Sequence, residues 1–549
     1  MILCRALIAA VGAAHLVAAL NVPLEQAAHP LPTLLDATLD ELRQGLDSGI
    51  FTSSDLVKAY LARIDETNLE LHAVTEVNPD ALAIAEALDK ARGGRLMTDQ
   101  PLYGIPILLK DNIATNDKMN NTAGCEALLG AKVPEDSTVA ARLRAAGAII
   151  LGKANMDQWA GFEQSGPDYG GKVVGAYSPR QYPMGSSSGS AVAASIGLAW
   201  ATVGTDTTGS ITGPAGANNI VGLRPTLGLV PRHLVIPYSE HFDTVGPMAR
   251  TVKDAAYLLS AIAGPDERDN YTSAFPFSQV PNYVGACNTS GLKGKRIGHA
   301  RYLHTNVSCA VDESALKVLR NAGAEIVDIA FDGRDDGRTM DRLQNVLSDH
   351  YLNIAQIDFK ANLAEYFSKL ITNPNNITST VDLVRYTQDK YPNYWNDPAN
   401  SGHLPYLETP PLNNSEASRL VWGNFSRMKS AASQYGFSAA FNKGEVDAFV
   451  IPFCDTYNRQ IYANGQPFIT VPFERLKDDR YATDKNGLMV YGTNYPMGIT
   501  FLGPQWSEEQ LLGIAYAFEQ ETMFRKNMTP YIKPTSELEA RVRRRALRS

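Results

Sequence analysis

Two glycine-rich stretches carry the hydroxyl groups that could take part in chemistry. They read MGSSSGSAVAAS at residues 184–195 and GTDTTGSITGPAG at residues 204–216. Because glycine lets the backbone turn several N–H groups toward one point, residues 207–210 could present donors to a developing oxyanion, and Ser210 could act as a nucleophile. The alternative is an ordinary Gly/Ser loop, since such turns are common and a single serine is rarely a nucleophile.

A lysine at the end of an apolar run is the candidate base. Residues 104–109 read GIPILL, and Lys110 follows directly. The run predicts a buried strand, and α/β enzymes place their sites at the carboxyl edge of such strands. Burial lowers the pKa of a lysine, so Lys110 could hold its neutral form and accept a proton without any histidine. An ion pair with the neighbouring Asp111 is the alternative, which the spacing leaves open.

Helical stretches and short apolar runs alternate around these residues. Strands are predicted at 104–109, 146–152, 447–453 and 467–473. Helices are predicted at 53–68, with Ser53 or Ser54 as the cap, at 137–146 and 507–522, and as a small-residue helix packed deep inside at 191–203. This alternation predicts a mostly parallel sheet that is covered on both faces.

The chain is long, at 549 residues, yet it reads as one α/β domain over residues 20–535. Polar and proline-rich pieces interrupt the pattern at about 264–435, which predicts a variable, loop-rich insertion on that domain. The basic ending at 536–549 predicts a solvated tail.

Several blocks together resemble the amidase signature family. GIPILLKDNI at 104–113, followed by GSSSGS and TDTTGS, is similar to the catalytic core of that family. Further similar blocks come in the expected order, namely LGKANMDQWA at 151–160, DTVGPMARTVKDAA at 243–256 and PMGITFLGP at 496–504. Agreement of all these blocks by chance is improbable. The resemblance implies a twisted mixed sheet flanked by helices on both faces.

Carried over residue by residue, the resemblance implies a hydrolase that cleaves a carboxamide C–N bond. It makes Ser210 the nucleophile, Ser186 a proton relay that follows an unusual cis peptide bond, and Lys110 the base. It places Ser187 and Asp206 as supporting hydrogen-bond partners. It assigns the oxyanion hole to the backbone N–H groups of Thr207, Thr208, Gly209 and Ser210. It implies no metal and no organic cofactor.

Departures from the family pattern concern the substrate. GSSSGS looks closer to the peptide-amidase-like branch than to the commoner GGSSGGS, which predicts a peptide-like or small-molecule amide as substrate. Thr212 stands where many relatives have arginine. Glu240 and Phe242 interrupt a stretch that often reads His-Ser-Gln-Asp in the family. These changes leave the predicted chemistry intact.

The beginning of the chain predicts export. An apolar stretch from Ala6 to Leu20 is broken only by His15, which predicts a signal peptide over residues 1–19 and is too short for a spanning anchor. We therefore expect a secreted glycoprotein with no membrane segment after cleavage. The N-x-S/T sequons begin at Asn120, Asn270, Asn288, Asn306, Asn376, Asn413, Asn424 and Asn527.

The net charge and the cysteine positions limit which partners and disulfides can be predicted. The net charge of −8 argues against a nucleic-acid partner, because binding nucleic acid requires a basic face. A homodimer is a candidate assembly. Loss of Cys4 with the signal peptide would leave Cys125, Cys287, Cys309 and Cys454. We favour a Cys287–Cys309 disulfide, with free buried thiols as the alternative. Zinc-type Cys/His spacings are absent from the sequence.

Two alternative hypotheses for the function remain open. Residues 185–189, GSSSG, satisfy the nucleophile-elbow pattern of α/β-hydrolases, with Ser187 as the nucleophile of an esterase. That mechanism needs a histidine late in the chain, and the last one is His403. The other reading is a secreted binding protein that keeps the amidase fold without catalysis.

Overall fold

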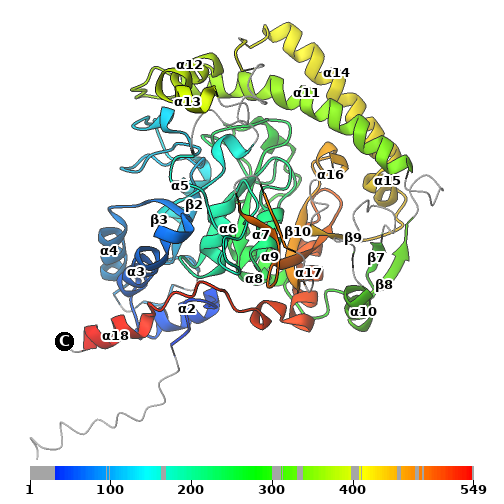
Figure 1. Cartoon of the computed structure of the whole chain (residues 1–549). Coiled ribbons are helices and arrows are strands. Elements are labelled where there is room, and N and C mark those ends of the chain that lie inside the picture. Colours follow the sequence, from blue (N-terminus) through cyan, green and yellow to red (C-terminus); the bar gives the residue numbers. More distant parts are fainter. Residues whose placement is uncertain are drawn as a thin grey trace, which may run out of the picture. The chain divides into compact units, whose positions relative to one another are not determined.

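A large mixed β-sheet with helices packed around it forms the computed structural model of this chain (Figure 1). The structure describes residues 31–546 apart from short gaps. The gaps are residues 94, 98, 162–167, 300–310, 312, 330–337, 397–406, 410, 454–458, 477–480 and 485–486. The predicted signal peptide, Cys4, Asn306, and Cys309 with its predicted disulfide lie outside the described residues, as does Cys454. Residues Thr33–Ser549 form one compact unit.

Eleven described strands make up the sheet. They are β1 (Val74–Val77), β2 (Pro106–Lys110), β3 (Ile149–Ala154), β4 (Ala201–Asp206), β5 (Val221–Arg224), β6 (Thr244–Ala249), β7 (Arg296–His299), β8 (Glu325–Asp328), β9 (Ala448–Pro452), β10 (Phe468–Arg475) and β13 (Pro496–Leu502). Their order is β1-β3-β2-β4-β6-β5-β10-β13-β9-β7-β8, and β11 (Ala482–Thr483) pairs separately with β12 (Met489–Tyr491).

Strand directions confirm the mixed sheet and correct one prediction. β2 runs parallel to β3 and β4, and β7 runs parallel to β8 and β9. The other six pairings are antiparallel, so the sheet is not mostly parallel. A short apolar run that is buried on both faces reads the same whichever way its neighbour runs, so the sequence could not decide this point.

Helices cover the sheet and account for much of the remaining chain. They are α2 (Leu39–Asp47), α3 (Ser53–Leu71), α4 (Ala81–Arg92), α5 (Thr138–Ala145), α6 (Ser188–Ser195), α7 (Thr212–Ala217), α8 (Val252–Ile262), α9 (Tyr283–Ala286), α10 (Glu313–Asn321), α11 (Arg338–Ser368), α12 (Thr380–Lys390), α13 (Pro392–Trp395), α14 (Asn414–Tyr435), α15 (Phe437–Asn442), α16 (Arg459–Ala463), α17 (Glu508–Thr522) and α18 (Leu538–Ala546). Within the described residues, none of these helices is both long and apolar enough to cross a membrane.

Two local predictions are wrong in detail. The cap of α3 is Thr52, whose hydroxyl accepts from the Asp55 N–H while the Asp55 carboxylate accepts from the Thr52 N–H. This reciprocal capping box explains why Thr52 takes the place predicted for Ser53 or Ser54. The small-residue helix spans Ser188–Ser195, residues 196–200 form a turn, and the last three residues of the predicted run begin β4. Gly197, with φ +68°, makes the turn between them.

The predicted loop-rich insertion contains regular structure. β7 and β8 extend one edge of the sheet, and the 31-residue helix α11 packs against α14, seen as two long ribbons side by side in Figure 1. Hydrophobic residues of α11, including Tyr351, Ile354 and Phe359, belong to the same apolar cluster as Phe449 of β9. Their helical spacing in a polar stretch was too weak a signal to show this packing.

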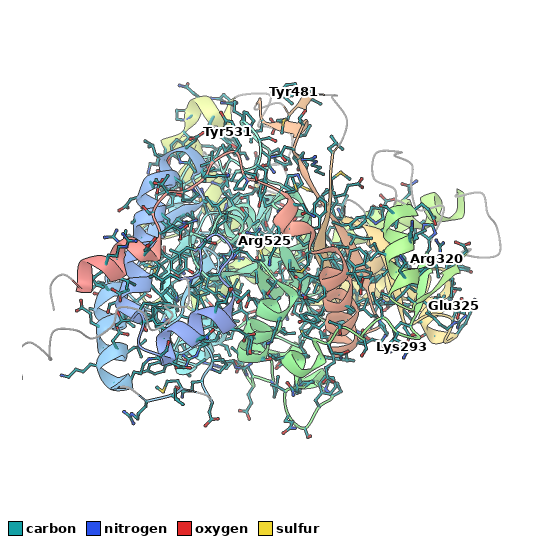
Figure 2. The ribbon with its side chains drawn as sticks, turned by 90° about the horizontal axis from the view of Figure 1, so that it is seen from below. Lys293, Arg320, Glu325, Tyr481, Arg525 and Tyr531 are labelled. Carbon is teal, nitrogen blue, oxygen red and sulfur yellow. The ribbon has the colours of Figure 1, made fainter. Side chains whose placement is uncertain are left out.

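The predicted solvated tail is partly structured. α18 packs on α3, and Glu537 accepts from the buried guanidinium of Arg63 at 2.9 Å. Just before it, Arg525 donates to the carbonyl groups of Leu35 and Ser195, both at 2.9 Å; Figure 2 shows Arg525 from below. Arginine contacts therefore connect the C-terminal part of the chain to α3, to the end of α6 and to the turn that contains Leu35.

The carboxylates of the half-buried Glu519 and the buried Asp254 predict how stability changes with pH. Removal from water raises the pKa of Glu519 to about 8; the Val252 N–H, which donates to its Oε1 at 2.9 Å, opposes this shift, and the charge of Asp254 adds to it. A raised pKa adds stability below the unfolded value near pH 4.5, and this contribution is lost as the pH rises through 8. We expect Glu519→Gln to raise the melting temperature at pH 9 and to leave it unchanged at pH 4.5. The exposed Glu509 of the same helix supplies the control, Glu509→Gln, and equal effects of both changes would contradict the assignment.

Candidate active site

The carboxyl end of β2 places Lys110 in the interior. The Lys110 side chain is fully buried, and its Nζ donates to Ser186 Oγ at 2.8 Å and to the Thr205 carbonyl at 3.2 Å. Burial lowers the pKa of Lys110 to about 7, against the opposing charges of Asp157 and two further aspartates. A substantial neutral fraction at neutral pH therefore makes Lys110 competent as a base.

The alternative pairing of Lys110 with Asp111 is not formed. The Asp111 carboxylate accepts from the Thr122 hydroxyl and, at 3.3 Å, from the Gly124 N–H. The cation whose charge acts on it is Lys153 of β3, which itself donates to the Ile113 carbonyl at 2.5 Å. Successive residues of a strand point to opposite faces, which explains why Lys110 and Asp111 have different partners.

Ser186 and Ser187 have different surroundings. The Gly185–Ser186 peptide bond is cis, as the resemblance implies, and the Ser186 hydroxyl is the one that meets Lys110. The Ser187 hydroxyl is fully buried, donates to the Thr205 carbonyl at 3.0 Å and accepts from the Thr205 N–H at 3.3 Å. Ser187 therefore holds α6 against β4; its hydroxyl and the Lys110 amine both donate to the Thr205 carbonyl, and the described residues show no hydrogen bond between the two.

Ser210 lies on the turn that follows β4. Gly209 has φ +92°, which allows this turn, and the Ser210 carbonyl accepts from the Ser187 N–H at 3.2 Å. In the part of the chain that the structure describes, the Ser210 hydroxyl makes no hydrogen bond. The structure thus joins Lys110 to Ser186 and brings Ser210 to the same edge of the sheet, but it shows no hydrogen bond between the two serines.

The turn offers three of the four predicted oxyanion donors. The Gly209 N–H already donates to Asp206 Oδ1 at 2.9 Å, so it is engaged. Asp206 Oδ2 accepts from the Ile211 N–H at 2.7 Å, and Arg224 donates to the Asp206 carbonyl at 2.8 Å. Asp206 thus supports the turn from inside. Among described residues, the N–H groups of Thr207, Thr208 and Ser210 have no acceptor, which leaves them as donors for a bound oxygen.

Comparisons with known proteins show the family of the chain. The Amidase family model matches residues 55–512. The chain belongs to the amidase signature family. A putative amidase of Arthroderma benhamiae is 41% identical, with 92% of this chain and 89% of that protein covered. The peptide amidase of Stenotrophomonas maltophilia has a similar structure, with a TM-score of 0.75, 34% identity, and 91% and 99% of the two chains covered. An amidase family protein of Bacillus anthracis gives a TM-score of 0.76 at 32% identity, with 90% and 93% covered.

Residues outside the predicted set also contact residues 207–210, the predicted oxyanion turn of this amidase. The Thr207 hydroxyl donates to Asp243 Oδ1 at 2.7 Å, and Asp243 Oδ2 accepts from the Tyr238 and Ser239 N–H groups. The Tyr351 hydroxyl of α11 lies 3.3 Å from Thr208 Oγ1. Tyr351 comes from the segment predicted to be a variable insertion, so no spacing in the sequence connected it with the site.

The Tyr351 contact makes a testable claim about this amidase. We expect Tyr351→Phe to lower kcat/KM several-fold, because it removes one hydrogen bond that holds the oxyanion turn, with little change in melting temperature. Tyr283→Phe is the control, since Tyr283 of α9 is also buried but its hydroxyl has no partner among the described residues. Steady-state kinetics of both variants would check this, and equal losses would contradict a specific role for Tyr351.

A cavity of about 200 Å³ adjoins the turn of this amidase. Its lining includes Thr207, Asn112, Trp159, and Tyr366 of α11. Glu240, one of the departures from the family pattern, is exposed and also lines a larger neighbouring hollow of about 660 Å³. The cavity offers room for a small substrate group beside the candidate oxyanion donors.

Among the described residues of this amidase, a single group of three could offer metal ligands. Glu240, His241 and Asp358 have ligand atoms within 4.8 Å of one another. His241 Nδ1 lies 2.8 Å from Asp358 Oδ2, which also accepts from the Ser239 hydroxyl at 2.5 Å. These contacts already satisfy Asp358, so the group is explained as a hydrogen-bonded cluster.

The described sequons of this amidase fall into two groups. Asn120 and Asn424 are not freely exposed: Asn120 Oδ1 accepts from the Gly130 N–H at 3.0 Å, and Asn424 Oδ1 lies 2.7 Å from His350 Nδ1. The exposed ones are Asn270, Asn288, Asn376, Asn413 and Asn527. Of the predicted cysteines, Cys125 is buried, and the Cys287 thiol donates to the Tyr283 carbonyl at 3.6 Å.

Proposed function

We propose that this amidase hydrolyses its carboxamide substrate through Ser210, Ser186 and Lys110, releasing a carboxylic acid and ammonia or an amine. The observation that carries the proposal is the 2.8 Å contact between Lys110 Nζ and Ser186 Oγ, made inside the protein where the pKa of Lys110 is about 7. A buried amine with a pKa near the working pH is suited to take up and return a proton.

The proposed steps follow from these positions. Neutral Lys110 takes the Ser186 proton as Ser186 takes the proton of Ser210, whose Oγ attacks the amide carbon. The oxygen of the tetrahedral intermediate is held by the N–H groups of Thr207, Thr208 and Ser210. The proton returns through Ser186 to the leaving nitrogen, the C–N bond breaks, and an acyl-enzyme remains on Ser210. Water, activated by the same pair, then adds to the ester and releases the acid.

A peptide-like amide is the substrate class that we propose. The support is the GSSSGS sequence, the similarity to a peptide amidase structure, and the cavity beside the turn, whose lining includes aromatic residues. The exposed Glu240 at the rim fits a substrate with polar or cationic character away from the scissile bond.

Hydrolysis of a substrate panel tests the proposal. Peptide amides, fatty amides, aryl amides and esters with matching acyl groups would be assayed with the wild-type enzyme, following ammonia or amine release. We expect turnover of a peptide amide to exceed that of the other amides. Turnover confined to esters would contradict the proposed reaction, and turnover confined to fatty amides would contradict the proposed substrate class.

The esterase alternative with Ser187 as nucleophile is not favoured by the geometry, because both hydrogen-bonding capacities of the Ser187 hydroxyl are used by Thr205. The binding-protein alternative predicts no covalent reaction with a fluorophosphonate. Labelling at Ser210 would contradict it, since the reagent attaches only to an activated serine.

We also propose that the protein is secreted and glycosylated. The support is the apolar stretch at residues 6–20 and the five exposed sequons of the described chain. N-terminal sequencing of the protein from a eukaryotic culture medium should find a start near residue 20, and an N-glycosidase should lower its mass. A product retained in the cell with residue 1 in place would contradict export.

A further inference from the structure

We propose that Asp157 is a positioning residue for the Ser186–Lys110 pair, holding the Ser186 segment in place from the end of the neighbouring strand. The inference rests on the proposed mechanism of Ser210, Ser186 and Lys110 and adds a residue to it. β3 runs parallel to β2, so residues that follow β3 emerge at the same edge of the sheet as Lys110. Asp157 comes three residues after β3 ends at Ala154.

Three contacts join Asp157 to the Ser186 segment. Its backbone N–H donates to the Ser186 carbonyl at 3.2 Å. Its Oδ1 accepts from the Ser188 hydroxyl at 3.4 Å. Its Oδ2 lies against the Cα of Gly185, where an added Cβ would come within 1.8 Å of that oxygen. The residues before, at and after the relay are therefore all in contact with one aspartate.

The carboxylate also acts on Lys110 through its charge. Burial lowers the pKa of Lys110, and of the charges that oppose this effect, that of Asp157 is the largest, ahead of Asp206 and Asp243. The last two are held by the oxyanion turn and by the 238–239 backbone, respectively. Asp157 is thus the carboxylate that both touches the relay segment and stabilises the ammonium form of Lys110.

Asp157 also acts on titratable groups other than Lys110. Burial raises the pKa of Asp168 and of Tyr182 and the charge of Asp157 adds to each effect, whereas burial lowers the pKa of Lys172 and the charge of Asp157 opposes this, so that the pKa of Lys172 is raised. Lys172 Nζ lies 3.6 Å from Asp168 Oδ2, so these two groups form their own pair. Asp168 is therefore a matched control: it is a carboxylate beside Asp157, and its charge is not among those that act on Lys110.

Asp157→Asn keeps the shape of the side chain and removes its charge. The pH profile of kcat/KM for a turned-over amide would be compared in wild type, Asp157→Asn and Asp168→Asn. Loss of the negative charge disfavours the ammonium, so the acidic limb should move to lower pH in Asp157→Asn only. The plateau should fall about tenfold or more, through kcat, because Ser186 is less well held.

The outcomes separate this inference from the mechanism on which it rests. An acidic limb that stays in place in Asp157→Asn, or that moves equally in Asp168→Asn, overturns it. If Asp157→Asn does not fold, Gly185→Ala decides, since its methyl group must displace the carboxylate; an unchanged kcat/KM in folded Gly185→Ala overturns the inference, and a fall of about tenfold supports it. Activity retained by Lys110→Met would instead show that the proposed mechanism itself fails.

Discussion

Replacing Ser210 with alanine is expected to lower kcat/KM for amide hydrolysis by about 10⁴-fold or more. The change removes the attacking oxygen and leaves the turn intact, because the hydrogen bonds that shape it come from Asp206 and from the Ser210 backbone. Melting temperature should therefore stay near the wild-type value. Single-turnover and steady-state assays with the best amide of the panel would measure the loss.

Ser187→Ala provides the matched control, at the serine that follows Ser186 in the chain. Its hydroxyl bonds only the Thr205 backbone, so the variant should lose some stability, keep measurable turnover, and still be labelled by a fluorophosphonate at Ser210. Labelling that survives Ser210→Ala but disappears in Ser187→Ala would reverse the assignment of the nucleophile and favour the esterase alternative.

Sequence alone located the parts of the site that lie on regular local signals. Lys110 follows a continuous apolar run, which places it at the end of a buried strand, and the glycines around Ser186 and Ser210 mark the two turns. The family resemblance then supplied the roles, and the mixed sheet flanked by helices agrees with it. The spacing could not show which side chain Lys110 contacts, because Asp111 is its neighbour in the chain whereas Ser186 is 76 residues away.

Contacts between segments that are distant in the chain could not be predicted from the sequence, for a physical reason. Asp157, Asp243 and Tyr351 contact the site from three different segments of the chain. Asp157 and Asp243 lie in blocks that resemble the family, but the resemblance assigned them no role, and Tyr351 lies in no such block. Their proximity depends on strand order and on the packing of α11, both of which are set by the whole core. Local sequence patterns therefore identify the residues that carry the chemistry but not the residues that position them.

The same limit explains the errors in the fold. The run from Ala191 to Val203 is apolar except for Ser195, Gly197 and Thr202, so neither a period of 3.6 nor a period of 2 is visible in it, and the turn at Gly197 decides where α6 stops. The segment at 264–435 looked loop-rich because its polar residues and prolines dominate the composition. Its long helices are stabilised by contacts with the core, such as Tyr351 and Phe359, which composition does not reveal.

Removing the amine of Lys110 is expected to lower kcat/KM by about 10²- to 10⁴-fold, the usual contribution of a general base. Lys110→Met keeps the length and apolar character of the side chain, so it tests the amine itself. In the wild type, kcat/KM should fall on the acidic side with a midpoint near pH 7, because burial lowers the pKa of Lys110 to about 7 and the protonated amine cannot accept a proton. A plateau that extends down to about pH 4 would contradict the neutral-lysine mechanism.

Replacing Lys110 with arginine distinguishes a general base from a fixed positive charge at this position. Lys110→Arg keeps a cation that does not deprotonate in proteins, so it should be as inactive as Lys110→Met at every pH if proton uptake is the function of this residue. Lys153→Arg is the matched control on the adjacent strand, because Lys153 is equally buried but bonds Ile113 and Asn121 instead of a catalytic serine. Activity in Lys110→Arg, with loss in Lys110→Met, would mean that Lys110 acts only as a fixed charge. Inactivity of both, with an active Lys153→Arg, would leave proton transfer through Ser186 as the explanation that fits the geometry.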